Sequence, residues 1–299
     1  MAKLLVCDSI SASAVEEMRA LGVTVDVRDT ITPEELTAVI GDYDAIVVRS
    51  RTKVRAPMLE NPGNLKYIIR GGVGVDNIDV EVAKAKGIKV LNTPAATSNS
   101  VAELALGLMF ALARRIAYAD ATMKAGQWEK KTLKGLELAG KTLGVIGYGR
   151  IGKLLAQKAR ALGMKVVAYD PYVQDEDIVP LEELLKQADY ISLHLPHTDE
   201  THDLLSADQF AMMKPGVFIV DAARGGVVDE EALYNALVEG RVAGAALDVY
   251  TEEPPQKELL HNLVALPQVV AMPHIGASTK EGQARIGGEV VALAKEYLL

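Results

Sequence analysis

Three polar residues in the second half of the chain carry side chains that together suit the exchange of a proton and a hydride. Arg224 follows the apolar run 217–223, Glu253 follows the run 246–252, and His274 follows the run 269–273. A histidine can exchange a proton near neutral pH, and a neighbouring carboxylate raises its pKa and fixes its orientation. An arginine can hold a carboxylate and polarise an adjacent carbonyl group. This set of groups suits the interconversion of a secondary alcohol and a ketone.

Each of these residues also has a simpler interpretation. His274 after a proline can be a turn residue, Glu253 before two prolines can be a solvated acid, and Arg224 can be a loop cation. Their common position favours a site, because each follows a strand-like run and ligands bind beyond the carboxyl ends of strands in a doubly wound sheet. We therefore expect the three side chains to converge.

A glycine motif precedes them in "VIGYGRIGKLL", residues 145–155. Gly147, Gly149 and Gly152 have the spacing G-x-G-x-x-G between a strand-like run and a strong helical pattern. The first glycine permits a tight turn, the second lets the backbone approach a pyrophosphate, and the third lets helix and strand pack closely. The helix N-terminus at Arg150 and Ile151 supplies N–H groups and partial positive charge. The motif predicts a dinucleotide site, although a plain glycine-rich turn has the same spacing.

An acid stands at the end of the next strand-like run. Asp170 follows Gly152 by 18 residues, close to the spacing at which an acid accepts hydrogen bonds from the adenosine ribose and repels a 2′-phosphate. This position favours NAD over NADP. The alternative is that Asp170 only begins the turn that continues through Pro171 and Tyr172.

A second glycine-rich segment, "RGGVGVDNID" at residues 70–79, departs from this fingerprint. Asn77 stands where the third glycine would be. The main-chain N–H groups of Gly72, Val73 and Gly74 can bind a carboxylate, and a plain turn before a helix is the competing interpretation.

Cations gather just before this segment. Arg49, Arg51, Lys53 and Arg55 stand at alternate positions after a strand-like run, and Arg70 ends the next one. If the strand continues, the alternation predicts one anion-binding side, whereas a turn would leave some of these residues as surface charge.

Composition limits the other possibilities. The chain has 299 residues and a net charge of −8, so it is not expected to bind nucleic acid or an anionic membrane. Its one cysteine, Cys7, is expected to be a buried core residue, and no metal-ligand pattern is visible. No apolar run is long enough for a signal peptide or a membrane span, so a cytoplasmic location is expected.

Short strand-like runs alternate with helical patterns, which is typical of an α/β protein with parallel sheets covered on both faces. The first alternation has strand-like runs at 3–8, 23–28, 45–50, 65–70 and 88–92. A helical pattern from Ser98 to about Ala125 follows. The second alternation has runs at 142–149, 164–170, 190–196, 217–223, 242–250 and 269–274. The final segment, 279–299, is helical and can pack back on the first unit, which makes the second unit an insertion. Two such domains leave a cleft in which a ligand can bind.

Four segments resemble the signatures of the D-isomer-specific 2-hydroxyacid dehydrogenases: "VIGYGRIG", "DAARGGVVDEEAL", "GAALDVYTEEPP" and "MPHIGAST". The segments "VRSRTKV", "IIRGGVGVDNID", "LNTPAATSNSVAELALGLM" and "MKAGQWEKK" extend the resemblance over nearly the whole chain. The resemblance implies two doubly wound parallel-sheet domains. A Rossmann NAD-binding domain formed by 98–279 would be inserted into a flavodoxin-like substrate-binding domain formed by 1–97 and 280–299.

The resemblance also implies roles for individual residues. Arg224 would bind the substrate carboxylate, and Glu253 would pair with His274, the general acid/base. NAD would be bound by Gly147, Gly149, Arg150, Ile151, Gly152, Asp170, Leu195, Ala222, Ala223, Asp248, Gly276 and Ala277. The substrate would be bound by Arg49, Lys53, Arg70, Gly72, Val73 and Gly74. No metal is implied.

Within the family, the sequence most resembles the phosphoglycerate dehydrogenases. This implies oxidation of D-3-phosphoglycerate to 3-phosphohydroxypyruvate in serine biosynthesis, with the phosphate bound by Arg49 and Arg70 near Lys53. Dehydrogenases or reductases for glycerate, glyoxylate, hydroxypyruvate or D-lactate share the three catalytic positions and remain an alternative. Proteins of similar sequence that act as NAD-sensing scaffolds are a further alternative, which the lack of a basic or disordered tail disfavours.

Three further expectations follow from the resemblance. The chain is expected to form a homodimer, with Trp128 against the partner subunit, unless Trp128 is simply a surface aromatic. Asp221 stands where the family commonly has asparagine, so hydrogen bonding near the cofactor is expected to differ. Because the sequence ends at Leu299, no C-terminal regulatory domain is expected.

Overall fold

The computed structural model describes all 299 residues, and the chain divides into two compact units. Unit 1 consists of Met1–Ser98 and Ala277–Leu299, and unit 2 consists of Asn99–Gly276. The chain therefore leaves unit 1, forms unit 2, and returns to unit 1 for its last helix.

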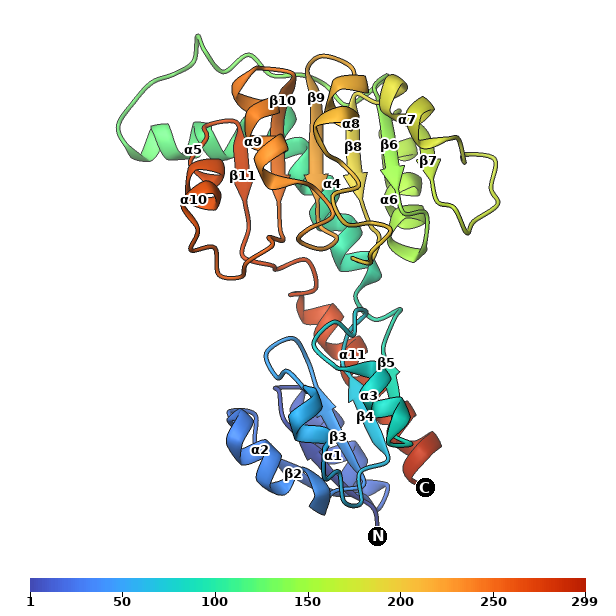
Figure 1. The fold of residues 1–299 in the computed structure, drawn as a ribbon. Coiled ribbons are helices and arrows are strands. Elements are labelled where there is room, and N and C mark those ends of the chain that lie inside the picture. Colours follow the sequence, from blue (N-terminus) through green and yellow to red (C-terminus); the bar gives the residue numbers. More distant parts are fainter. The chain divides into compact units, whose positions relative to one another are not determined.

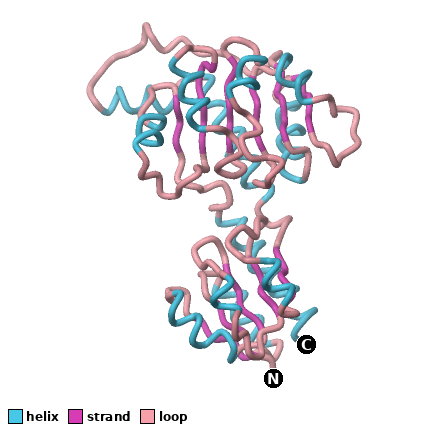
Figure 2. Tube along the Cα trace, viewed as in Figure 1, coloured by secondary structure: helices cyan, strands magenta, loops and turns pink.

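Unit 1 is built on a five-stranded parallel sheet of order β2-β1-β3-β4-β5, the flavodoxin-like order. Its strands are β1 (Lys3–Val6), β2 (Thr24–Val27), β3 (Ala45–Val48), β4 (Tyr67–Arg70) and β5 (Lys89–Asn92). Figure 2 shows these strands side by side with helices around them. The inner strand β3 is buried along its whole length, as expected for a strand covered on both faces.

Helices cover both faces of this sheet. One face packs against α2 (Pro33–Val39), α3 (Val80–Ala85) and the 3₁₀ turns η1 (Ile40–Asp42) and η2 (Ala56–Leu59), and the other packs against α1 (Ala12–Ala20) and α11 (Lys280–Leu298). The start of α2 has a capping box, in which Thr32 accepts from the N–H of Glu35 and Glu35 accepts from the N–H of Thr32. This fixes the helix start at Pro33.

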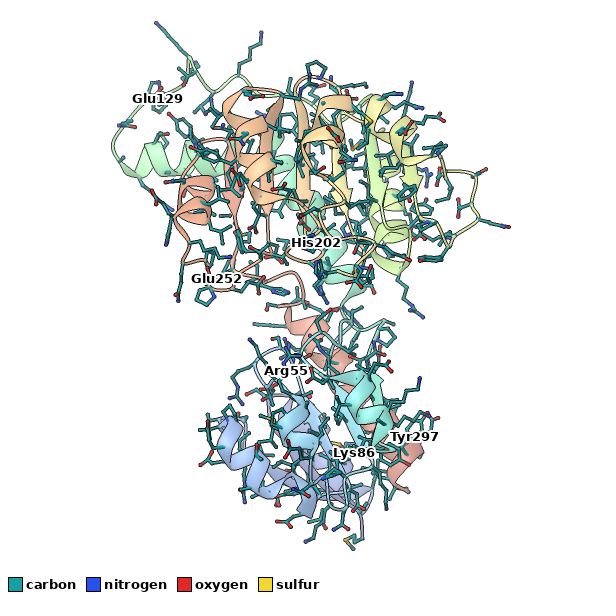
Figure 3. The ribbon with its side chains drawn as sticks, in the orientation of Figure 1. Arg55, Lys86, Glu129, His202, Glu252 and Tyr297 are labelled. Atoms are coloured by element: carbon teal, nitrogen blue, oxygen red, sulfur yellow. The ribbon has the colours of Figure 1, made fainter.

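The last helix, α11, completes the core of unit 1. Its buried apolar side chains, Ile286, Val290, Val291 and Ala294, belong to the same hydrophobic cluster as Leu4 of β1 and Met18 of α1. Tyr297, labelled near the end of α11 in Figure 3, has its ring centroid 5.4 Å from that of Tyr67. The helix is therefore a structural part of unit 1, although it lies at the opposite end of the sequence.

Unit 2 is built on a six-stranded parallel sheet of order β11-β10-β9-β8-β6-β7, whose strands are labelled in Figure 1. The strands are β6 (Thr142–Ile146), β7 (Lys165–Tyr169), β8 (Tyr190–Leu193), β9 (Val217–Asp221), β10 (Val242–Leu247) and β11 (Val269–Ala271). The strand order reverses direction at β6, which pairs with both β7 and β8. In a doubly wound sheet this switch point is where ligands bind.

Two layers of helices enclose this sheet. One face packs against α7 (Leu181–Gln187), α8 (Ala207–Met212), α9 (Glu230–Val238) and α10 (Glu258–Val264). The other packs against α4 (Ser98–Ala113) and α6 (Arg150–Ala161). Both layers are apolar, which explains why the strands read as nearly continuous hydrophobic runs in the sequence.

The helical pattern from Ser98 to about Ala125 forms two helices, which corrects the expectation of one continuous pattern. After α4 the chain turns at Arg115, whose φ of 51° is left-handed, and α5 (Ile116–Lys124) follows. The carbonyl of Ala113 accepts from the N–H of Leu136 at 2.8 Å. In an α-helix continuing past Arg115, that carbonyl would accept from an N–H four residues later in the same helix. The helix therefore ends where a residue distant in sequence, Leu136, takes this acceptor.

None of the helices is both long enough and apolar enough to cross a lipid bilayer.

Candidate active site

Glu253 and His274 form a hydrogen-bonded pair in unit 2. The Nδ1 atom of His274 lies 2.7 Å from Oε2 of Glu253. The other carboxylate oxygen of Glu253 accepts from the N–H of Tyr250 at 3.2 Å. The carboxylate is therefore held on one side by the backbone, and it fixes the imidazole so that Nε2 is available for proton exchange.

The electrostatics of this pair favour a protonated imidazole. The hydrogen bond to Glu253 raises the pKa of His274 above its ordinary value, and partial burial opposes this rise. Burial by itself would raise the pKa of Glu253, but the hydrogen bond and the charge of His274 hold it below its ordinary value. A histidine with a raised pKa can donate a proton to a carbonyl oxygen at neutral pH.

Arg224 belongs to the same group of charges. Its positive charge lowers the pKa of both Glu253 and His274, and its Nη1 donates to the carbonyl of Ala223 at 2.6 Å. The loop that carries Arg224 packs closely against the backbone that precedes Glu253. A Cβ at Gly225 would lie only 1.9 Å from the carbonyl oxygen of Tyr250. The structure thus brings the three polar residues together, and only a glycine allows the two loops to approach so closely.

Asp248 anchors the backbone that carries His274. Its two carboxylate oxygens accept from the N–H groups of Ile275 and Gly276, each at 2.8 Å. His274 itself has a φ of 53°, a left-handed conformation that is unfavourable for a side chain with a Cβ. The buried carboxylate of Asp248 therefore stabilises a strained backbone at the imidazole. Ala277, which follows Gly276, accepts from the N–H of Thr279 at 3.1 Å.

The glycine motif forms the turn from β6 into α6. Gly147 has a φ of 92°, and a Cβ there would lie 2.6 Å from the carbonyl oxygen of His194, next to Leu195. A Cβ at Gly152 would lie 2.2 Å from the carbonyl oxygen of Gly147. Gly149 faces open space and is exposed, as is Arg150 at the start of α6. The turn therefore needs glycine for its conformation and packing, and it leaves an exposed helix N-terminus next to partly buried Ile151.

Asp170 is fixed beside this turn. Its carboxylate accepts from the N–H of Tyr148 at 2.9 Å and from the N–H of Tyr172 at 3.0 Å. The second bond means that Asp170 does also begin a turn, the alternative that the sequence left open. A cavity of about 430 Å³ adjoins it, lined among others by Gly147, Gly149, Leu195 and Leu204.

A second buried acid lies close to Arg224. Asp221 is 3% exposed, and its carboxylate accepts from the N–H of Ala223 at 2.9 Å. Burial raises the pKa of Asp221 to about 7, and the N–H of Ala223 opposes this rise. Ala222 and Ala223 are buried with it. A titratable group thus stands three positions before Arg224 in the chain.

In unit 1, Arg49 and Arg70 lie at the ends of the neighbouring strands β3 and β4. Nη1 of Arg49 donates to Oε1 of Gln283 at 2.6 Å, while its buried Nε has no partner. Burial lowers the pKa of the Arg49 guanidinium. A buried guanidinium N–H without a partner is unfavourable unless a ligand supplies an acceptor.

Gly72 makes room for the second arginine. A Cβ at Gly72 would lie only 1.2 Å from Nη1 of Arg70, and a Cβ at Gly71 would lie 3.3 Å from Cγ of Arg49. The two arginine side chains therefore pack against the same glycine pair. The carbonyl of Val73 accepts from the Asn92 side chain at 2.6 Å, so this loop is tied to β5.

The remaining cations of the segment 49–55 do not join this arginine pair. Arg51 pairs with Asp8 at 3.0 Å, and Arg55, labelled in Figure 3, pairs with Asp79 at 2.9 Å. These two hold loops together, as the interpretation of a turn after the strand implied. Lys53 is exposed and lines a small cavity beside the start of α2.

Sequence reasoning missed two residues that support this arginine pair. Gln283 is 234 positions from Arg49, so no local pattern connects them. The Asn77 side chain donates to the carbonyls of Arg49 and Thr52, both at 2.7 Å. The sequence did mark Asn77, because it stands in the second glycine-rich segment at the position where a third glycine would complete the fingerprint.

Comparisons with known proteins agree with this arrangement. Residues 106–276 match the D-isomer specific 2-hydroxyacid dehydrogenase, NAD binding domain. The chain is 54% identical over 262 residues to a hydroxypyruvate reductase of Thermotoga maritima, which covers 86% of each chain. It is 47% identical over 306 residues to a D-3-phosphoglycerate dehydrogenase of Methanocaldococcus jannaschii, covering 100% of this chain and 58% of that protein.

A solved structure of D-lactate dehydrogenase from Aquifex aeolicus, complexed with NAD and lactic acid, has the same fold. Its TM-score is 0.85 at 30% identity, and the match covers 99% of this chain and 95% of that one. The chain spans little more than half the length of the phosphoglycerate dehydrogenase relative. On the family match, the sequence identities and the shared fold, this chain belongs to the D-isomer specific 2-hydroxyacid dehydrogenase family and is an NAD-dependent oxidoreductase.

Proposed function

We propose that the protein oxidises D-3-phosphoglycerate to 3-phosphohydroxypyruvate with NAD. The observation that carries this proposal is the arginine pair of unit 1, Arg49 and Arg70, with the unpartnered buried Nε of Arg49. Guanidinium groups suit phosphate because they donate two parallel hydrogen bonds. The N–H groups of Val73 and Gly74 on the adjoining loop make no backbone hydrogen bond, so they are suited to an anion as well.

In this proposal the side chains of unit 2 carry out the chemistry. Arg224 binds the substrate carboxylate and His274 takes the hydroxyl proton at Nε2, while Glu253 stabilises the imidazolium that forms. The hydride leaves the same carbon, and bound NAD supplies the acceptor for it. In the reverse direction His274 returns the proton to the carbonyl oxygen, which Arg224 polarises. The glycine turn of residues 147–152, Asp170 and the positions around Leu195, Ala222, Asp248, Gly276 and Ala277 are proposed to hold NAD.

Hydroxypyruvate reduction is the second candidate, because the relative at 54% identity carries that name. The two candidates differ in the need for a phosphate site. We therefore compare kcat/KM for 3-phosphohydroxypyruvate, hydroxypyruvate and glyoxylate with NADH. A preference for the phosphorylated acid is expected, and a preference for either of the other two would contradict the proposal.

Replacement of Arg49 tests the phosphate site directly. In Arg49→Gln, KM for 3-phosphohydroxypyruvate should rise about 10- to 100-fold, the effect of losing hydrogen bonds to a charged group. KM for hydroxypyruvate should change much less. Arg28→Gln removes the same charge from an exposed position of unit 1 and serves as the control. The same assay addresses the NAD-sensing scaffold, for which NADH would bind without turnover of any of these acids.

We also propose that the protein is a homodimer. The support is a group of exposed apolar side chains between residues 110 and 136 of unit 2: Phe110, Ile116, Met123, Trp128 and Leu136. Trp128 is 77% exposed. The segment after α5, on which Figure 3 labels Glu129, forms no helix or strand and projects from the unit. An apolar, projecting segment of this kind is suited to a self-complementary contact with a second copy.

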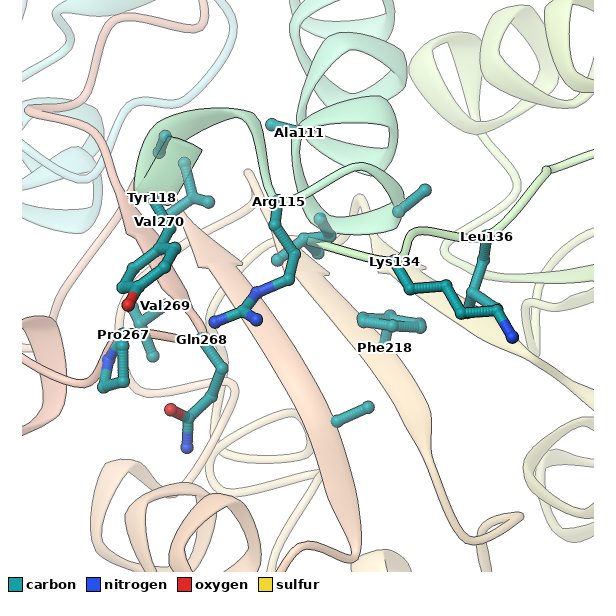
Figure 4. Close-up of a pocket in the computed structure, with 14 residues that line it drawn as sticks. Ala111, Arg115, Tyr118, Lys134, Leu136, Phe218, Pro267, Gln268, Val269 and Val270 are labelled. Carbon is teal, nitrogen blue, oxygen red and sulfur yellow. The ribbon is translucent and has the colours of Figure 1, made fainter. Parts of the chain in front are cut away.

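A cavity adjoins this surface. Figure 4 shows Arg115, Tyr118, Lys134, Leu136 and Phe218 around it, and the Arg115 guanidinium carbon lies 4.5 Å from the Tyr118 ring centroid.

Light scattering of Trp128→Glu tests the dimer, because a charge in an apolar interface should yield monomers. The exposed substitution Tyr172→Glu is the control. A wild-type protein that is monomeric at micromolar concentration would contradict the proposal.

The setting that we propose for this activity is serine biosynthesis in the cytoplasm. Expression of the chain in a serine-requiring bacterial strain that lacks its own phosphoglycerate dehydrogenase should restore growth without serine. Restoration should fail with Arg49→Gln and persist with Arg28→Gln.

A further inference from the structure

The cavity beside Asp170 in unit 2 has apolar walls and polar edges. It is lined by the ends of β6 and β7 and by residues from the segment 194–204, among which Leu195, Pro196 and Leu204 are apolar. Asp170 lies at one edge, and Tyr172 and Glu200 also line the cavity. A flat apolar ring with polar groups at its rim suits such a space.

Asp170 is the residue at this cavity that would bind the ribose of an adenosine. Its carboxylate is held by the N–H of Tyr148 in the glycine turn and by the N–H of Tyr172. In a dinucleotide fold an acid at this position accepts from the adenosine ribose hydroxyls. With the ribose at Asp170, the purine ring would have the apolar part of this cavity beside it.

Two further residues that line the cavity, Tyr172 and Glu200, are hydrogen-bonded to each other. The hydroxyl of Tyr172 donates to Oε2 of Glu200 at 2.9 Å, across 28 positions of sequence. Tyr172 is thus linked through its backbone to Asp170 and through its side chain to Glu200. A carboxylate can accept about four hydrogen bonds, so Glu200 keeps acceptor capacity after the tyrosine bond.

We propose that Glu200, positioned by Tyr172, accepts a hydrogen bond from the 6-amino group of the adenine and so selects adenine over a 6-oxo purine. The 6-amino group is a donor and matches a carboxylate, which has only acceptors when ionised. Hypoxanthine carries a 6-oxo acceptor at the same position and meets the carboxylate unfavourably. This inference rests on NAD binding in unit 2 and is independent of which hydroxy acid is the substrate.

The experiment compares binding of NADH and its deamino analogue, reduced nicotinamide hypoxanthine dinucleotide, by isothermal titration calorimetry without any hydroxy acid. We expect the wild type to bind NADH about fivefold more tightly, the size expected of one partly exposed hydrogen bond to a charged acceptor. In Glu200→Gln the ratio should fall to about one or below, because the amide can donate to a 6-oxo group.

Two variants complete the test. Tyr172→Phe removes the hydrogen bond from the tyrosine hydroxyl to Glu200, and it should give an affinity ratio between those of the wild type and Glu200→Gln. Glu239→Gln removes the same charge from an exposed position after α9 and should keep the wild-type ratio. An unchanged ratio in Glu200→Gln overturns the role of the acid, and an unchanged ratio in Tyr172→Phe overturns the positioning role of the tyrosine. Since no turnover is measured, either result is distinct from failure of the proposed reaction.

Discussion

Replacement of Asp221 by asparagine should stabilise the protein at alkaline pH and not at acidic pH. The carboxyl is 3% exposed, and burial raises its pKa from 3.8 to about 7. Glu230 and Asp248 add to the rise, while the N–H of Ala223 and the charge of Arg224 oppose it. An asparagine side chain cannot ionise, but its oxygen can still accept from the N–H of Ala223.

The sign follows from proton binding. Between pH 3.8 and about 7 the folded protein holds a proton on Asp221 that the unfolded chain has released. The free energy of unfolding therefore falls as pH rises through this range and levels off above the folded pKa. A difference of about three pH units at about 1.4 kcal/mol each gives about 4 kcal/mol in total. Between pH 5 and pH 8 the gain of Asp221→Asn over the wild type should grow by about 3 kcal/mol.

Hydrogen exchange of peptides that cover β9 measures this effect in unit 2. Wild type and variant are compared at the same pH, at pH 5, 6.5 and 8, so that the intrinsic exchange rate cancels. The exposed substitution Asp199→Asn is the control and should show a small difference that is independent of pH. A gain from Asp221→Asn that is equal at pH 5 and pH 8 would refute the reasoning.

Three further predictions concern the active site. Glu253→Gln removes the carboxylate charge that raises the pKa of His274, so the alkaline fall in kcat/KM for 2-oxo acid reduction should move to lower pH. An unmoved profile would show that the carboxylate does not act on the imidazole. Gly225→Ala places a Cβ 1.9 Å from the Tyr250 carbonyl oxygen, and the resulting shift of the arginine loop should lower kcat/KM about 100-fold, with NADH binding by calorimetry as the control. Asp248→Asn puts an amide against two backbone donors and should lower kcat, whereas an unchanged kcat would mean that His274 holds its conformation without this anchor.

Much of the fold could be predicted because its causes are local. The strands of both sheets read as apolar runs since each sheet is covered on both faces, and Thr32 with Pro33 marks a helix start. The break at Arg115 could not be read, because the sequence there has neither glycine nor proline. It accompanies a hydrogen bond from Leu136 to Ala113, which only the folded chain brings together.

The candidate site divides in the same way. The glycine turn has a local signature, and so do the arginine, the acid and the base that follow successive strands in this order. The neighbours of the cations do not: the alternate spacing left open whether the four cations share one side, and in the structure Arg51 is paired with Asp8 and Arg55 with Asp79. The partner of Arg49 is Gln283, from the other end of the chain. Which cations face a ligand depends on such distant pairings.

The return of the chain to unit 1 sets the order in which the protein can be completed on the ribosome. Domains generally fold as they emerge, the N-terminal one first. Here the first 98 residues emerge without helix α11, which packs on one face of their sheet, since Ile286, Val290 and Ala294 are translated only after unit 2. Unit 2 can therefore finish folding before unit 1 does. Until α11 has been translated, unit 1 of the nascent chain exposes the apolar surface that this helix later buries.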